Sequence, residues 1–182
     1  MSKVERFENQ RAAKYDQFVE IWIPNYHYFM EQVPKLLSEV TNKHLLVVGC
    51  GTGTEIERFV ETKQGWKILG VDPSPEMIAQ AKDRLGHWEE VELVEGTVDS
   101  LSKAVQYGAA TLLLVLHFME DDGTKKDLLQ GIADRLEQGA PLLLLDITGD
   151  ELQIEQNLQV LKALLPSSVP EEEVANRLHS VT

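Results

Sequence analysis

The chain has 182 residues, of which 43% are hydrophobic and 26% are charged, as expected for one soluble globular domain. Its formal net charge of −13 disfavours nucleic-acid binding, because a negative surface repels phosphate backbones. The sequence has no run of 18 apolar residues and no secretory signal, and its single cysteine excludes an internal disulfide; these features predict a cytoplasmic protein without a membrane span.

Two amphipathic helices are expected before the first strand. Apolar residues at helical spacing predict one helix over residues 5–22 and a second over residues 26–40, with Pro34 as a kink or a break in the second. Residues 1–40 are therefore predicted to form an N-terminal helical unit.

Strands and helices alternate in the middle of the chain. Strands are predicted over residues 45–48, 66–71, 91–94, 110–116 and 141–147. Helices are predicted over residues 55–62, 75–85, 101–107 and 125–136, with Ser74 capping the second of them and Gly86 ending it. Continuous apolar strands between amphipathic helices imply a parallel sheet covered on both faces. We therefore predict an α/β, doubly wound, mostly parallel sheet over residues 41–150.

The remaining residues, 151–182, show only helical patterns. One helix is expected over residues 151–165 and another from Pro170 onward, with a linker between them. No further strand can be recognised in this tail.

Three glycines follow the first predicted strand. The apolar run of residues 45–48 stops at Gly49, Gly51 and Gly53, and a helical segment follows. A strand, a glycine turn and a helix N-terminus together allow backbone to approach a ligand closely. Asp72 comes 19 residues after Gly53, at the end of the second predicted strand. That spacing suits a carboxylate within reach of a ribose diol.

These motifs resemble those of the class I S-adenosylmethionine-dependent methyltransferases of the small-molecule type. The resemblance rests on Val47–Glu55 and Gly70–Met77 and covers roughly residues 10–150. It implies a Rossmann-like fold, S-adenosyl-L-methionine as cofactor, a small-molecule acceptor and a lid formed by the N-terminal helices. The family usually closes its sheet with an antiparallel hairpin of two more strands, which is missing here. We therefore expect a truncated or shortened chain whose fifth strand has a bare edge and could pair in a homodimer.

The resemblance also implies roles for individual residues. Gly49, Gly51 and Gly53 would let the backbone pass beneath the methionine and ribose portions, and Asp72 would accept hydrogen bonds from the ribose hydroxyls. The other residues implied at the cofactor site are Tyr15 on the lid, Cys50 in the loop, Pro73 and Met77 over the adenine, Thr97 and the Val98 amide at the adenine edge, and Leu116 near the methionine arm. His117 would face the transferring methyl group as a general base.

Each assignment has a purely structural alternative. The glycines could form a tight turn without a ligand, and Asp72 could be a turn residue before Pro73. Cys50 is a small buried residue rather than a nucleophile, because no histidine is adjacent in sequence. Met77 could be a core residue, and His117 could serve packing alone.

Three rival functions remain open from the sequence. The chain could be a non-catalytic S-adenosylmethionine-binding partner or regulatory protein, or an enzyme similar to the carboxy-S-adenosylmethionine synthases of tRNA modification. A nucleotide-dependent oxidoreductase is disfavoured, because Thr54 stands where the dinucleotide fingerprint has its last glycine. The cysteine and histidine spacings show no zinc motif, so no metal is expected.

Overall fold

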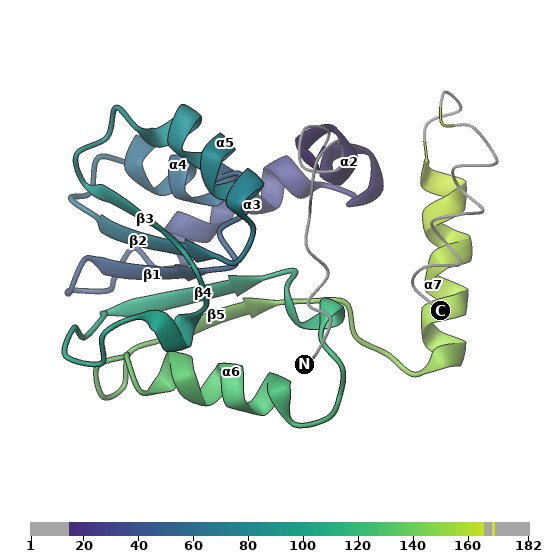
Figure 1. Ribbon diagram of the computed structural model, residues 1–182. Coiled ribbons are helices and arrows are strands. Elements are labelled where there is room, and N and C mark those ends of the chain that lie inside the picture. Colours follow the sequence, from purple (N-terminus) through teal and green to yellow (C-terminus); the bar gives the residue numbers. More distant parts are fainter. Residues whose placement is uncertain (1–14, 166–168, 170–182) are drawn as a thin grey trace.

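The computed structural model describes residues 15–165 and residue 169, and within them five strands form one parallel sheet (Figure 1). The strands are β1 (His44–Val48), β2 (Lys67–Asp72), β3 (Val91–Glu95), β4 (Ala109–Leu113) and β5 (Leu142–Leu145). Their order is β3-β2-β1-β4-β5. The second and third strands therefore lie on one side of β1, and the fourth and fifth lie on its other side. In open α/β sheets, ligands bind at the carboxyl ends of the strands at such a switch point, here between β1 and β4.

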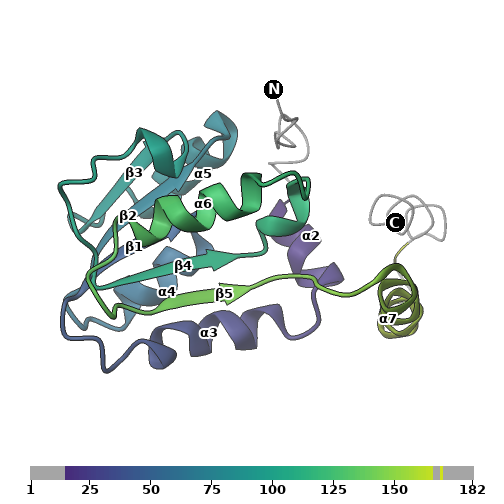
Figure 2. The same ribbon diagram turned by 90° about the horizontal axis from the view of Figure 1, so that it is seen from below.

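Helices cover both faces of the sheet (Figures 1 and 2). One face carries α3 (Tyr26–Leu36), α4 (Thr54–Glu61) and α5 (Pro75–Leu85), and the other carries α6 (Thr124–Ala133). A shorter helix, α2 (Tyr15–Trp22), lies beyond the carboxyl ends of the strands in both views. The helical lid expected from the sequence therefore begins on the side of the sheet where ligands bind.

The core is divided by the sheet into two clusters. Leu45 and Val47 of β1 point to the side of α3 and α4, whereas Leu46 and Val48 point to the side of α6. All four side chains are buried, which explains why β1 is apolar at four consecutive positions after His44 rather than at alternate ones. Burying a side chain of this size stabilises the fold by about 1.5–3 kcal/mol.

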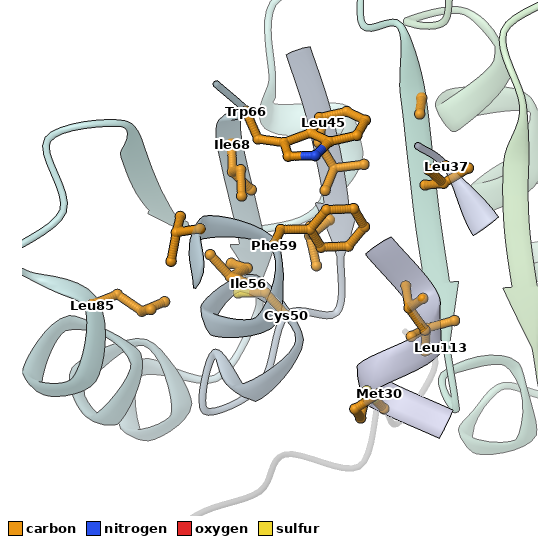
Figure 3. Close-up of a cluster of buried hydrophobic side chains, with 14 of the residues drawn as sticks. Met30, Leu37, Leu45, Cys50, Ile56, Phe59, Trp66, Ile68, Leu85 and Leu113 are labelled. Atoms are coloured by element: carbon orange, nitrogen blue, oxygen red, sulfur yellow. The ribbon is translucent and has the colours of Figure 1, made fainter. Parts of the chain in front are cut away.

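The larger cluster is centred on two aromatic side chains. Phe59 of α4 and Trp66, which precedes β2, meet edge to face with their ring centroids 5.2 Å apart. Figure 3 shows this pair with Leu45, Ile56 and Ile68 between the helices and the sheet. These contacts hold α4 in place, and α4 begins at the glycine-rich loop after β1.

Most predicted elements are present within a residue or two of their predicted bounds. Ser74 caps α5 as expected, because its hydroxyl accepts the Met77 N–H at 3.3 Å, and the helix ends at Gly86. Pro34 lies inside α3, which ends two residues later at Leu36. The predicted helix from Pro170 and the start of the first helix lie outside the described residues.

Two helices end earlier than predicted, α3 at Leu36 rather than at residue 40 and α6 at Ala133 rather than at residue 136. Two further predictions were wrong. The predicted helix over residues 101–107 is instead a short 3-10 turn, Val98–Ser100, followed by an irregular segment. Leu101 and Tyr107 are buried in the second core cluster, so tertiary packing holds this segment without helical hydrogen bonds. The strand predicted over residues 110–116 ends at Leu113, because Leu114 has a left-handed backbone with φ of 59° and turns the chain out of the sheet.

The tail expectation is confirmed for its first helix, α7 (Glu151–Leu164). Asp150 caps it by accepting the Gln153 N–H at 2.8 Å. Both views show α7 standing apart from the sheet (Figures 1 and 2). Of the described strands, β5 pairs only with β4, so its outer edge is free within this part of the chain.

Candidate functional site

The loop between β1 and α4 is shaped by three glycines with left-handed backbones. Their φ angles are 71° at Gly49, 51° at Gly51 and 83° at Gly53. A Cβ atom at Gly49 would lie 2.5 Å from Val115 Cγ2, and one at Gly53 would lie 2.6 Å from Leu85 Cδ1. These two glycines are therefore required by packing inside the protein itself.

Gly51 differs from the other two glycines. Among the described residues, the nearest atom to a Cβ placed there is Tyr15 Cε1, at 3.9 Å. Internal packing does not explain a glycine at this position, although the left-handed backbone favours one. The loop thus leaves open space at the carboxyl end of β1, as a cradle for a ligand would.

Asp72, at the end of β2, is oriented by two backbone amides. The Gly51 N–H donates to Asp72 Oδ2 at 3.0 Å, and the Ser74 N–H donates to Oδ1 at 2.9 Å. Burial raises the pKa of this carboxyl above its usual value, although the amides of Ser74 and Gly51 offset part of that effect. Since each carboxylate oxygen can accept more than one hydrogen bond, both remain able to accept from a ligand diol.

The lid helix α2 is tied to the glycine loop through Asp16. The Thr52 hydroxyl donates to Asp16 Oδ1 at 2.6 Å, and Arg84 of α5 pairs with the other carboxylate oxygen. Arg84 also donates to the Thr54 hydroxyl. Three elements distant in sequence are therefore joined in one polar network beside the loop.

Tyr15, at the start of α2, lies beside the same loop. Its ring is the nearest described group to a Cβ placed at Gly51, and burial, followed by the charges of Asp72 and Asp16, raises the pKa of its hydroxyl to about 12. The hydroxyl is therefore neutral at physiological pH and can donate a hydrogen bond.

The other predicted site residues lie along this edge of the sheet. Pro73 and Thr97 are exposed, and Met77 and Val98 are buried. Thr97 follows Gly96, whose N–H donates to the Asp72 carbonyl at 2.9 Å, so the end of β3 is fixed beside the end of β2. The Val98 side chain belongs to the second core cluster.

Cys50 is a structural residue of the loop. Its backbone N–H donates to the Val71 carbonyl at 3.1 Å, and its side chain packs in the larger core cluster (Figure 3). Burial raises the pKa of the thiol far above its usual value. A thiol that stays protonated is a poor nucleophile, so the sequence-based interpretation of Cys50 as a small buried residue is consistent with this geometry.

His117 and Leu116 lie in a 3-10 turn after β4, and this turn is held by a residue that the sequence reasoning missed. Asp146, directly after β5, accepts hydrogen bonds from the N–H groups of Val115 at 3.0 Å and Leu116 at 2.6 Å. Its Oδ1 atom lies 2.7 Å from His117 Nδ1. A signal was present, since Asp146 follows an apolar strand just as Asp72 does, and the ends of parallel strands meet at one edge.

A second missed residue, Glu55, directly follows the glycine loop. It is in the first turn of α4 and is buried, and its Oε1 atom has no hydrogen-bond partner among the described residues. Burial raises the pKa of this carboxyl to about 7, and the Thr111 hydroxyl of β4 offsets this only in part. The helical pattern of α4 did not reveal this, because a glutamate in a first turn is ordinarily an exposed residue.

In residues 15–165 and 169, no three His, Cys, Asp or Glu side chains are grouped so as to hold a metal ion. In the part of the chain that the structure describes, every helix is too short or too polar to cross a bilayer.

Comparison with known families gives a match over the sheet. Residues 46–142, more than half of the chain, match the model of a family described as a methyltransferase domain. This region runs from β1 to the start of β5 and contains the glycine loop, Asp72 and His117.

Curated proteins of two kinds are similar in sequence. Carboxy-S-adenosyl-L-methionine synthase 1 from Yersinia pseudotuberculosis serotype IB (strain PB1/+) is 27% identical over 127 residues, which are 66% of this chain and 53% of that protein. Malonyl-[acyl-carrier protein] O-methyltransferase from Bacillus cytotoxicus is 32% identical over 83 residues, which are 46% of this chain and 29% of that protein. The chain therefore spans about half, or less, of the length of these relatives.

Solved structures share the fold. The plantazolicin methyltransferase BpumL, solved in complex with SAH, superposes with a TM-score of 0.69 at 17% identity. The superposition covers 96% of this chain and 65% of that one. The Rossmann-like arrangement predicted from the sequence is thus confirmed.

Proposed function

This chain belongs to the methyltransferase domain family, and on that premise we propose that it transfers a methyl group from S-adenosyl-L-methionine to a small-molecule acceptor. The observation that carries the proposal is the Asp72 carboxylate, held by the amides of Gly51 and Ser74 beside the open space at Gly51. A carboxylate at the end of the second strand can accept hydrogen bonds from the hydroxyls of a ribose. SAH, the demethylated form of the cofactor, is bound by the similar protein BpumL.

The residues present fit the cofactor, and we assign them as follows. Asp72 would accept from the ribose hydroxyls, Gly51 would lie under the ligand, and Tyr15 would cover it from the lid. The further assignments are Gly49, Cys50 and Gly53 as the loop backbone, Pro73, Met77, Thr97 and Val98 around the adenine, and Leu116 near the methionine arm.

S-adenosylmethionine, when bound, supplies a methyl group on a positively charged sulfur, so the protein need not activate it. The chain's contribution is to position the acceptor and exclude water. His117 is assigned as the general base, because its ring lies in the turn at the end of β4 on the edge of the sheet that carries the loop.

The test is calorimetric titration with S-adenosylmethionine, SAH and NAD, for the wild type and an Asp72→Ala variant. We expect the first two ligands to bind and NAD not to bind. Losing the ribose acceptor should cost about 1.5–3 kcal/mol, a tenfold loss of affinity or more. Binding of NAD in preference to S-adenosylmethionine, or equal affinity in the variant, would contradict the proposal.

The sequence likeness to a carboxy-S-adenosyl-L-methionine synthase supports a second candidate, in which the chain modifies the cofactor itself. Such a reaction would call for a cation to hold a carboxylate. Arg84, a cation beside the loop, already pairs with Asp16, which favours methyl transfer. Mass spectrometry of the small molecules released from purified protein distinguishes the two, because the synthase product carries an extra carboxyl group. A non-catalytic binder would instead bind SAH, but it would not convert S-adenosylmethionine into SAH with any acceptor.

We also propose a cytoplasmic location and a homodimer that pairs through the edge of β5. The acidic composition and single buried cysteine support the first. The second is supported by the β5 edge, which is unpaired among the described strands, and by Leu144, a residue that is 42% exposed. Sedimentation of the wild type and a Leu144→Lys variant tests the dimer, since the charge should leave only monomer.

A further inference from the structure

One carboxylate organises the turn that carries His117. Asp146 Oδ2 accepts the N–H groups of Val115 and Leu116, and Oδ1 accepts those of His117 at 3.3 Å and Ile147 at 2.8 Å. Asp146, at the end of β5, thus accepts four backbone N–H groups, three of them from the turn after β4. Such a carboxylate holds the turn in one backbone conformation.

The turn is also fixed against the glycine loop. A Cβ at Gly49 would meet Val115 Cγ2 at 2.5 Å, so the Val115 side chain occupies the space that Gly49 leaves. His117 is two residues farther along, and its ring lies 3.9 Å from that of Phe118 between centroids. Its side chain is 23% exposed, so the ring is partly enclosed but still open to a small molecule.

The contact between the two side chains determines which ring nitrogen of His117 carries hydrogen. Burial, the largest single effect, raises the pKa of Asp146, but the His117 side chain and the amides of Ile147 and Leu116 together lower it below its usual value. Asp146 is therefore ionised at neutral pH and can only accept hydrogen bonds. His117 Nδ1, at 2.7 Å from Oδ1, must then be the N–H donor. In the neutral ring, Nε2 is left with a free lone pair.

We propose that Asp146 is a positioning residue that fixes His117 as the Nδ1–H tautomer, so that Nε2 takes the proton that an amine or hydroxyl acceptor loses during methyl transfer. This inference rests on the proposed function for the identity of the reaction. In the step, the acceptor atom forms a bond to the methyl carbon, and the carbon–sulfur bond breaks with its electron pair going to sulfur. The acceptor's proton ends on Nε2, and Asp146 stays ionised beside the imidazolium.

The acceptor class follows from the proton. An amine or a hydroxyl must lose a proton to become a neutral methylated product, and a base beside it accelerates that loss. A tertiary amine or a thioether has no such proton and would gain nothing from Nε2. The pair of Asp146 and His117 therefore points to an acceptor with a proton on nitrogen or oxygen.

The first test measures the tautomer and needs neither cofactor nor acceptor. Long-range proton–nitrogen correlation spectra of the full chain, labelled with ¹⁵N-histidine at alkaline pH, distinguish a protonated from a bare ring nitrogen. The signal that disappears in His117→Gln identifies this residue among the five histidines. We expect a protonated Nδ1 and a bare Nε2 in the wild type, and a mixture of tautomers in Asp146→Asn, whose amide group no longer demands a donor.

Several outcomes would overturn the proposal. A wild-type His117 protonated on Nε2 would do so, as would an unchanged tautomer in Asp146→Asn. If circular dichroism shows that Asp146→Asn folds poorly, Asp146→Glu serves as the second variant. It keeps a carboxylate acceptor and should therefore retain the wild-type tautomer. Calorimetry with SAH on the same samples separates the tautomer proposal from the proposed function. A wild type that does not bind SAH would contradict the methyltransferase function, whereas the tautomer result would be unaffected.

The second test uses labelled S-adenosylmethionine with a panel of secondary amines, alcohols, tertiary amines and thioethers. We expect label transfer to an amine or alcohol, reduced about 100-fold or more in His117→Gln and in Asp146→Asn. The double variant should lose little beyond either single variant, since both residues act through one proton. Transfer confined to tertiary amines or thioethers, or fully additive losses, would contradict the proposal.

Discussion

The Asp16 carboxylate on the lid helix accepts a hydrogen bond at 2.6 Å from the hydroxyl of Thr52, in the glycine loop. The two residues are 36 positions apart in sequence. Because Arg84 pairs with the same carboxylate, the lid, the loop and α5 share one network. The position of the lid therefore depends on polar contacts whose removal should have measurable effects.

Thr52→Val should loosen the lid. It removes the hydroxyl group that donates to Asp16 while keeping the side chain's shape. One hydrogen bond contributes about 1 kcal/mol to stability. We expect faster amide hydrogen exchange in Tyr15–Trp22 and a several-fold weaker affinity for SAH. Glu20→Gln is the matched control, because Glu20 is on the same helix and, within the described part of the chain, pairs with the exposed His27 ring at 2.9 Å. Equal exchange in both variants would show that the network does not hold the lid.

Asp72→Asn should reduce both stability and cofactor affinity. A carboxamide offers one oxygen where the carboxylate offers two, so one of the Gly51 and Ser74 amides would face an NH2 group. An unsatisfied buried donor costs about 1–3 kcal/mol, and we expect urea unfolding to show a loss in that range. Affinity for SAH should fall tenfold or more. Asp83→Asn, on the exposed side of α5, serves as the control and should change neither quantity.

Gly53→Ala should mainly lower the stability of the protein, whereas Gly51→Ala should mainly lower its affinity for SAH. At Gly53 an added Cβ meets Leu85 Cδ1 at 2.6 Å and Ala81 Cβ at 3.3 Å, so strain and overpacking should cost about 2–4 kcal/mol in denaturant unfolding. At Gly51 only the left-handed backbone is strained, which costs about 1–2 kcal/mol. Gly51→Ala should instead lose most of its affinity for SAH. Normal SAH binding by Gly51→Ala would mean that the ligand does not lie over this glycine.

Stability should depend on pH through Glu55. Burial raises the pKa of Glu55 to about 7, whereas an unfolded glutamate titrates near its ordinary value of about 4.3. The folded protein therefore binds more protons than the unfolded one between these values, and its stability falls as pH rises from about 4.5 to about 7. Glu55→Gln removes this pH-dependent contribution to the free energy of unfolding. Its free energy of unfolding relative to the wild type should rise by about 2–3 kcal/mol from pH 5 to pH 8, and a difference independent of pH would contradict the raised pKa.

The sequence determined most of the elements and the glycine loop, because those features are local. Alternating apolar strands and amphipathic helices predict the parallel sheet, and the glycines at 49, 51 and 53 with Asp72 predict where a ligand approaches. Glycine adopts a left-handed backbone more readily than any other residue, so three closely spaced glycines after a strand are visible as a pattern without a fold. The predicted helix over residues 101–107 failed because buried contacts of Leu101 and Tyr107 override local propensity.

Only the tertiary structure decided which distant residues share the site. Asp146 and His117 are 29 residues apart, and they meet because β4 and β5 are parallel neighbours whose carboxyl ends coincide. Asp16, Thr52 and Arg84 meet because α2 lies over the strand ends and α5 packs beside the loop. Glu55 is buried because the sheet and its helices close around it. Side-chain chemistry is written in the sequence, but the distances that decide hydrogen bonding and proton affinity arise only when the sheet assembles.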